Sequence, residues 1–468
     1  GYIKKSKYVN DSSSVIYIPN FKTVFYDPDT VRYKIQKAVF SMQLHSTGTY
    51  SDPGDDIMEG AIITDDYADI ASYIWKLEDT GQPITCDVET FSLKHPTSGI
   101  GTITLCTSKD AGIAFPIDLS ENNNSKALRN LLKEFFKNYY GNITYHSATF
   151  DVYILIAQLF MKDILDYEGL LEGLEVMFKN WDCTKLIAYL ATNTCAGNNL
   201  SLKQLAQEFA GNYANENIKD ITLIPLPELL EYNLIDTLST WYVYNKHMPT
   251  VVSDEQSEVY NNIFKPAVID IIQMQLTGLP IDREEVLKLE KQLNLANDKV
   301  KESMDNSMII QSFVYEMNIQ WVTWKNTQLK TKVVTLADSK ESFSPNSPKQ
   351  LQTILYSKEF LDLPILDYTK TKLPSTGAKT LLKLKNHTTD PDVLSFLDDL
   401  IEFKSIDKIL STFIPAFLKA PKAADGWYYL FGFFNLGGTI SARLSRNDPN
   451  LQIMPSSSIW ANAIKLCI

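Results

Sequence analysis

The sequence has few cysteines and no long apolar segment, and each shortage excludes a class of protein. Its five cysteines are odd in number and include no Cys-x-x-Cys pair, which argues against a disulfide framework or a zinc site and indicates reduced thiols. No apolar run is long enough to cross a bilayer, and residues 1–20 contain no apolar stretch followed by a cleavage site. We therefore predict a cytoplasmic protein that does not associate with membranes.

The chain also lacks an excess of positive charge, internal repeats and low-complexity tracts. A net charge of −12 argues against binding nucleic acid through overall charge, although a local basic groove can hold a phosphate backbone on an acidic protein. The 468 residues, 44% of them hydrophobic, are sufficient for two or three domains. Composition therefore predicts a multidomain globular protein and leaves its partners open.

The hydrophobic pattern divides the chain into three segments. Residues 1–63 combine polar residues with aromatic-rich stretches, one of them a predicted strand at residues 33–43, and form an N-terminal appendage. In residues 64–250, strands alternate with amphipathic helices, which predicts an α/β domain with a largely covered sheet. Residues 255–468 are predicted to be mostly helical. Within them, the alternating pattern of residues 312–343 predicts a small β insertion.

Two carboxylates occupy one predicted buried strand. Asp87 and Glu89 are two residues apart in ITCDVE, residues 84–89, so both side chains point to the same face. Like charges this close are buried mainly when they are protonated or when cations bridge them. Alone, Asp-x-Glu is a weak signal, because an exposed edge strand produces the same letters.

Further carboxylates are available to the same site. Asp151 follows a predicted strand, and Asp236 lies four residues after Tyr232 on a predicted helix, so these two share a helical face. Such a set of hard oxygen ligands suits two Mg²⁺ or Mn²⁺ ions about 3.5 to 4 Å apart, which promote in-line attack at phosphorus. Each residue also has a structural explanation. Asp151 fits a carboxylate that stabilises a helix N-terminus, Tyr232 a packing residue and Asp236 a solvated helical position. Their order and context together favour the metal site.

Three segments resemble the exonuclease motifs of the DEDD superfamily, in its tyrosine-containing subclass: CDVET (86–90), HSATFD (146–151) and YNLID (232–236). The resemblance implies a ribonuclease-H-like, mixed-sheet domain with metal-dependent 3′-to-5′ exonuclease activity on single-stranded 3′ ends of DNA. Tyr232 would position the attacking water. Two Mg²⁺ (or Mn²⁺) ions would be held by the four carboxylates Asp87, Glu89, Asp151 and Asp236.

Other parts of this region extend the resemblance, with one departure. WDCTKLIAYL (181–190) and LSLKQLA (200–206) resemble the connecting segments of proofreading domains. The second motif often carries Asn after its His, whereas Ser147 follows His146 here, which affects an expected contact with the substrate strand. We assign His146 a structural role.

The second half resembles the polymerase region of family A DNA polymerases. MQLTGLPIDREEV (274–286) is similar to its opening, SPNSPKQLQTIL (344–355) to its thumb, and residues 434–455 to a block that faces the primer-template duplex. This implies an incomplete polymerase domain, mainly thumb. Ala442 stands where Gly is usual, which could alter how closely the backbone approaches DNA.

Basic residues are concentrated in this half and predict contacts with phosphates that carry no sequence preference. For about half of the lysines, a solvated helix face is an equal explanation. The resemblance further implies that Arg443 reaches the minor groove and that Asn450 and Gln452 face the duplex. The basic set consists of Lys349, Lys370, Lys372, Lys379, Lys383, Lys385, Lys404, Lys408, Arg443 and Arg446.

In the family, the polymerase metal ligands lie in an Asp-x-Ser-x-x-Glu segment and a later His-Asp pair, and both would follow Ile468. We expect nucleotide addition to require either a longer polypeptide or a second chain that carries the palm and fingers. Some phage polymerases have an insertion at the position of residues 312–343 that binds a processivity partner. The alternative for this segment is a hairpin on the thumb that binds no partner. The compact, divergent motifs suggest a phage protein.

The leading hypothesis is therefore the proofreading exonuclease and thumb of a replicative family A DNA polymerase. One alternative is a stand-alone exonuclease or repair nuclease of the DEDD superfamily. Another is a non-catalytic DNA-binding assembly subunit with structural carboxylates. Metal-dependent release of nucleotides separates the last alternative from the other two.

Overall fold

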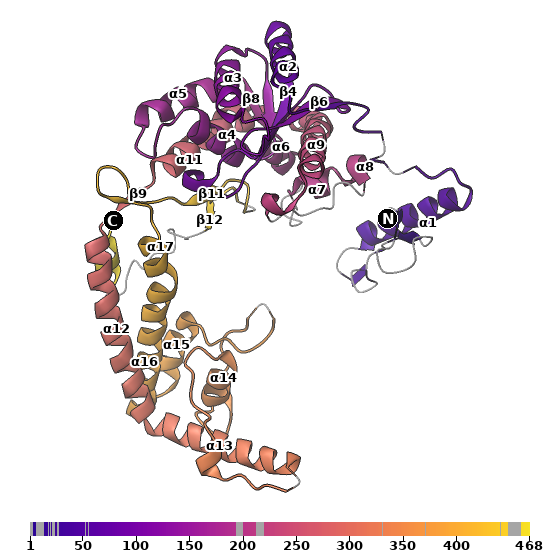
Figure 1. Ribbon diagram of the computed structural model, residues 1–468. Helices are drawn as coiled ribbons and strands as arrows, with labels where there is room; N and C mark the ends of the chain where they lie inside the picture. Colours follow the sequence, from indigo (N-terminus) through magenta and orange to yellow (C-terminus); the bar gives the residue numbers. More distant parts are fainter. Residues whose placement is uncertain are drawn as a thin grey trace. The chain divides into compact units, whose positions relative to one another are not determined.

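The protein is described by a computed structural model whose elements form two compact units (Figure 1). The first comprises Gly1–Gly278 and Phe431–Asn447, and the second comprises Leu279–Leu430 and Asp448–Ile468. The structure describes residues 3–5, 14–16, 18, 20, 24–25, 28–51, 53–54, 56–192, 200–211, 220–329, 331–369, 371–439, 441–447 and 460–468.

The first unit is built on a six-stranded mixed sheet in the order β3-β6-β5-β4-β7-β8. The central strand β4 pairs in parallel with β7 and antiparallel with β5, and the outer pair β3 and β6 is parallel. This sheet and its helices confirm the predicted α/β fold class. The strands are β3 (Gly60–Ile63), β4 (Ile84–Glu89), β5 (Thr102–Cys106), β6 (Ala111–Pro116), β7 (Ile143–Tyr145) and β8 (Trp181–Cys183).

Helix α9 (Leu226–Ser253) lies against β4, β5 and β6 and carries two of the five predicted exonuclease residues. Its residues Leu230, Leu234 and Leu238, spaced four apart, pack on Cys106 and Ala114 of the sheet, as expected of a helix with one apolar face. The other major helices are α2 (Tyr67–Thr80), α3 (Ser125–Asn138), α4 (Ala148–Leu159), α5 (Tyr167–Met177), α6 (Thr184–Ala191) and α11 (Lys265–Thr277).

The compact units divide at Gly278, beyond the predicted end of the α/β domain at residue 250. Helix α11 explains the difference, because it packs against α4 and α5. Its buried residues Val268, Ile272 and Leu276 belong to the same core as the sheet.

At the N-terminus, the predicted strand at residues 33–43 was wrong. These residues form part of helix α1 (Pro28–Ser46). Its buried positions Val31, Ala38 and Ser41 are separated by seven and three residues, which is a helical spacing. Aromatic and β-branched side chains on the exposed part of the helix imitate a strand, because such residues are enriched in strands.

The second unit is mostly helical, as predicted. Helix α12 (Arg283–Asn306) packs along α16 (Pro391–Lys408), and a core that includes Leu293 and Phe396 lies between them and their neighbours. The remaining elements are α13 (Met308–Gln328), α14 (Pro348–Tyr356), α15 (Ala378–Leu384), α17 (Ile414–Leu418), β9 (Leu279–Ile281) and β10 (Tyr428–Leu430). Among the described helices of both units, none is long and apolar enough to cross a membrane.

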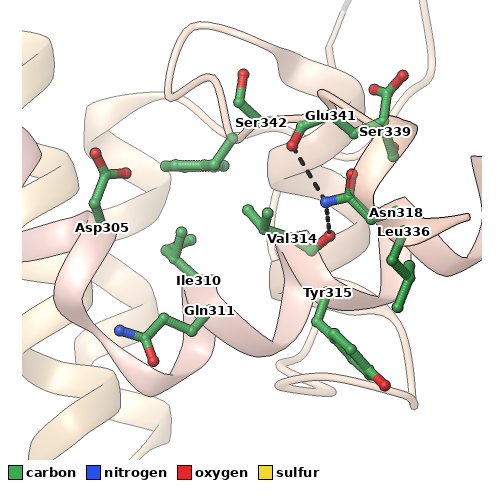
Figure 2. Close-up of a pocket in the computed structure, with 11 residues that line it drawn as sticks. Asp305, Ile310, Gln311, Val314, Tyr315, Asn318, Leu336, Ser339, Glu341 and Ser342 are labelled. Atoms are coloured by element: carbon green, nitrogen blue, oxygen red, sulfur yellow. Dashed lines mark hydrogen bonds between the residues drawn. The ribbon is translucent and has the colours of Figure 1, made fainter.

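The predicted β insertion at residues 312–343 was also wrong, because α13 occupies its first half. Only Ile310 and Phe313 of this helix are buried, so the sequence has little helical periodicity to detect. The following loop lies across the helix, where the Asn318 amide donates to the backbone oxygens of Val314 and Glu341 (Figure 2). Loop and helix line an open pocket of about 800 Å³, which has both polar and apolar walls.

Candidate functional site

Three elements of the first unit bring the five predicted exonuclease residues together. Asp87 and Glu89 occupy the second half of β4, and Asp151 lies in the first turn of α4, directly after the neighbouring strand β7. Tyr232 and Asp236 lie on α9, which contacts β4. The charges of Glu89, Asp151 and Asp236 each raise the pKa of Asp87, which shows that the four carboxyls form one electrostatic cluster.

Burial dominates the electrostatics of this cluster. It is the main cause that raises the pKa of Asp87 well above its usual range, followed by the charge of Asp151. Burial, then the charge of Asp236, raises the pKa of Glu89 to about 8. Burial also raises the pKa of Asp151 to about 7 and that of Asp236 to about 6. Without a compensating cation, the cluster therefore holds protons near neutral pH.

Lys203 supplies positive charge beside these carboxyls. It lies on the short helix α7 (Leu202–Leu205), with its Nζ 3.9 Å from Asp236 Oδ2 and 4.0 Å from the centroid of the Tyr232 ring. The ammonium group donates a hydrogen bond to the Tyr232 hydroxyl. Sequence analysis assigned no role to Lys203, although it lies in the segment LSLKQLA (200–206) that resembles a connecting segment of proofreading domains.

Asn233 is a second residue that sequence analysis missed. Its Nδ2 donates to Asp87 Oδ2 at 2.6 Å, and its side chain is fully buried. It directly follows Tyr232 in the third motif. This neighbouring position in the sequence was the only signal that Asn233 lies near the carboxyl cluster.

The donor chemistry of the four carboxylates fits hard divalent cations such as Mg²⁺. In the part of the chain that the structure describes, no group of three or more His, Cys, Asp or Glu side chains is arranged to hold a metal ion. Instead, Asn233 engages Asp87, and Lys203 lies beside Asp236. The two-cation site and its ligand geometry therefore stay a prediction.

His146 has the contacts of a structural residue. Its ring nitrogens lie 2.9 Å from Thr184 Oγ1 and 3.0 Å from the backbone oxygen of Leu200. Burial is the main cause that lowers the pKa of His146 to about 4, which keeps the ring neutral. The ring thus links the end of β7 to α6 and to the segment that precedes α7.

The predicted DNA-binding residues are distributed over both units. Lys349 at the start of α14 and Lys372 are exposed residues of the second unit. Arg443 is exposed between β11 (Phe433–Asn435) and β12 (Ser445–Asn447) of the first unit. Lys370, Asn450 and Gln452 lie outside the described residues.

Some of the other basic residues have structural partners. Lys383 pairs with Asp367 at 2.7 Å, and Lys385 pairs with Asp398 at 2.5 Å. Lys404 is half-buried, and desolvation lowers its pKa. These lysines support the alternative of ordinary helix faces for part of the basic set.

The β11–β12 hairpin is held against the α/β unit. Lys185 of α6 donates to Asn435 Oδ1 at 2.9 Å, and the Tyr189 hydroxyl donates to the Thr439 backbone oxygen at 3.0 Å. These contacts hold to α6 the hairpin that carries the exposed Arg443.

Ala442, which stands where the family has Gly, adopts a left-handed φ of 56°. We expect Ala442→Gly to raise the free energy of unfolding by about 0.5 to 1 kcal/mol, because glycine avoids the steric cost of this conformation. The matched control Ala157→Gly, within α4, should lower it by about 1 kcal/mol. Urea denaturation of both variants measures the difference; a loss of stability in Ala442→Gly would contradict this account.

Comparison with known proteins finds similarity to DNA polymerases. The family model of DNA polymerase family A matches residues 316–468. The chain is 24% identical over 395 residues to DNA polymerase I of Synechocystis sp., an alignment that covers 83% of this chain and 35% of that protein. Residues 316–468 of this chain are therefore similar to DNA polymerase family A. This confirms the polymerase resemblance of the second half.

Two further similarities to DNA polymerases extend over both units. The DNA polymerase of Bacillus phage SP01 is 24% identical over 67% of this chain and 33% of its own length. The POL domain of Pol1 from M. smegmatis, solved with DNA primer-template and dNTP, shares the fold with a TM-score of 0.58 at 16% identity, covering 87% of this chain and 58% of that one. The chain spans about a third of the length of the Synechocystis and SP01 polymerases.

Proposed function

We propose that this family A chain carries the metal-dependent 3′-to-5′ exonuclease site that proofreads during DNA replication. The observation that carries the proposal is the cluster of four carboxyls contributed by β4, α4 and α9, of which Asp151 is buried and the other three are partly buried, with Tyr232 beside it. Maintaining such mutual repulsion costs folding free energy, and perturbed carboxyls of this kind concentrate at functional sites. The order of the three sequence motifs supports the same reading.

In this proposal, Asp87, Glu89, Asp151 and Asp236 hold two Mg²⁺ or Mn²⁺ ions. When bound, the ions supply charge stabilisation for the attacking and leaving oxygens at phosphorus. Burial and the neighbouring carboxylates raise the pKa of Tyr232 well above its usual value, so its hydroxyl keeps its proton. Lys203 holds that hydroxyl in place. We assign Tyr232 the role of orienting the attacking water.

We further propose that the chain binds DNA as its substrate. The exposed Arg443, Lys349 and Lys372 would contact the phosphates of a template-primer duplex, while the single-stranded 3′ end enters the carboxylate site. Exposed cations can serve this purpose despite the net charge of −12. The similar Pol1 domain was solved with a primer-template, which supports this proposal.

The test is degradation of an oligonucleotide labelled at its 5′ end, followed base by base, with Mg²⁺ and with EDTA. We expect stepwise shortening from the 3′ end with Mg²⁺ and none with EDTA. A control oligonucleotide with a phosphorothioate linkage at its 3′ end should be degraded more slowly. Absence of shortening in a folded, DNA-binding sample would contradict the proposal and favour a non-catalytic DNA-binding subunit.

A further inference from the structure

Asn233 links Asp87 to the adjacent strand through a buried hydrogen-bond chain. The amide Nδ2 donates to Asp87 Oδ2 at 2.6 Å, and Thr102 Oγ1 donates to Asn233 Oδ1 at 3.1 Å. Both Asn233 and Thr102 are fully buried. Thr102 is also the cross-strand partner of Glu89 in the β4–β5 pairing. The hydrogen-bond chain therefore connects the Asp87 carboxylate to α9 and β5, and the strand pairing places the backbone of Glu89 opposite Thr102.

Chemistry determines the orientation of this amide. When Asp87 is ionised, as cation binding requires, its carboxylate can only accept hydrogen bonds, so the NH₂ group of Asn233 then faces Asp87 and its oxygen accepts from Thr102, as the structure has it. The backbone of Asn233 is held as well, since its oxygen accepts from Thr237 Oγ1 at 2.9 Å and from Thr104 Oγ1 at 3.4 Å. The amide is thus fixed from two sides before any ligand binds.

We propose that Asn233 is a positioning residue of the exonuclease, which sets the orientation of the Asp87 carboxylate for cation binding. The inference rests on the proposed function. A charge-assisted bond at 2.6 Å to Oδ2 restricts rotation of the ionised carboxylate, which would hold its orientation when a cation is bound. Groups that orient metal ligands in this way typically change metal affinity by about 10- to 100-fold when they are removed.

A merely packing role would have different consequences. If Asn233 only filled space between α9 and the sheet, removing its amide would reduce stability and leave cation affinity unchanged. Asn233→Asp separates the two roles, because it keeps the size of the side chain but replaces the donor that faces Asp87 with a carboxyl oxygen. A carboxylate facing a carboxylate repels it and rotates Asp87 away.

The experiment measures Mn²⁺ affinity by electron paramagnetic resonance on the DNA-free protein, and Mg²⁺ half-saturation of the exonuclease in parallel. We expect Asn233→Ala and Asn233→Asp each to weaken Mn²⁺ binding by about 10- to 100-fold and to raise the Mg²⁺ half-saturation concentration in parallel. At saturating Mg²⁺, kcat should largely recover in Asn233→Ala. Asn245→Ala, an exposed asparagine on the same helix, is the matched control and should bind Mn²⁺ like wild type.

Thr102→Val provides a second route if the Asn233 variants do not fold. It removes the hydroxyl that fixes the amide and leaves Asn233 in place, so we expect a smaller loss of Mn²⁺ affinity in the same direction. Unchanged affinity in the folded variants, with a wild type that binds Mn²⁺ and degrades DNA, would overturn this inference and leave the proposed function intact. A wild type that neither binds Mn²⁺ nor degrades DNA would overturn both.

Discussion

Replacing Asp87 and Glu89 together with alanine is expected to lower the rate of 3′-end degradation by at least about 10³-fold. Divalent cations stabilise the transition state of phosphoryl transfer by several kcal/mol, and each 1.36 kcal/mol corresponds to about a factor of ten in rate. Losing two of the four proposed ligands removes most of that stabilisation. The measurement is the single-turnover rate on a 5′-labelled single strand at saturating Mg²⁺.

The same variant should be more stable than wild type in EDTA at pH 8, which distinguishes lost chemistry from lost folding. Burial and mutual repulsion disfavour charge on Asp87 and Glu89, so removing both carboxyls relieves a cost of folding. Glu134→Ala with Glu175→Ala, two exposed residues of the same unit, is the matched control and should change neither property. A variant that is inactive and also less stable in EDTA would contradict the account of a strained carboxylate cluster.

The cation-free protein is expected to lose stability as the pH rises from about 4 to 8. In the folded state, the pKa of Glu89 is raised from 4.5 to about 8, and that of Asp151 from 3.8 to about 7. Asp236 changes in the same direction, from 3.8 to about 6. The folded protein therefore binds more protons than the unfolded chain within this window, and stability must fall as the pH increases. The stability that these carboxyls contribute is fully present below their pKa values in the unfolded chain. It is lost as the pH rises through their pKa values in the folded protein.

Mg²⁺ should reverse this loss, because it compensates the charges that protons neutralise at lower pH. We expect millimolar Mg²⁺ to raise the melting temperature clearly at pH 8 and only slightly at pH 5. Thermal unfolding at both pH values, with Mg²⁺ and with EDTA, provides the measurement. The variant Asp87→Asn with Glu89→Gln should show little Mg²⁺ dependence at either pH. An equal Mg²⁺ effect at both pH values would exclude the carboxylate cluster as its source.

Local periodicity was sufficient to predict the strand and the helix that form the site. Residues two apart in an extended segment share a face, and residues four apart share a face of a helix, so the pairs Asp87 with Glu89 and Tyr232 with Asp236 were predictable. The same reasoning was wrong at residues 33–43 and 312–343. In both regions the helix buries few side chains, and exposed aromatic and β-branched residues imitate the pattern of a strand.

The sequence by itself determined the α/β class of the first unit, the helical character of the second, the resemblance of the second half to family A polymerases and the identities of the candidate site residues. Each of these depends on patterns within short segments or on motif order along the chain. Only the tertiary structure decided that Asn233 and Lys203 lie against Asp87 and Asp236. It also decided how far the carboxyl pKa values are raised. Burial and distances between α9, α7 and β4 arise only when segments far apart in the chain pack together, and those quantities set the strength of charge interactions.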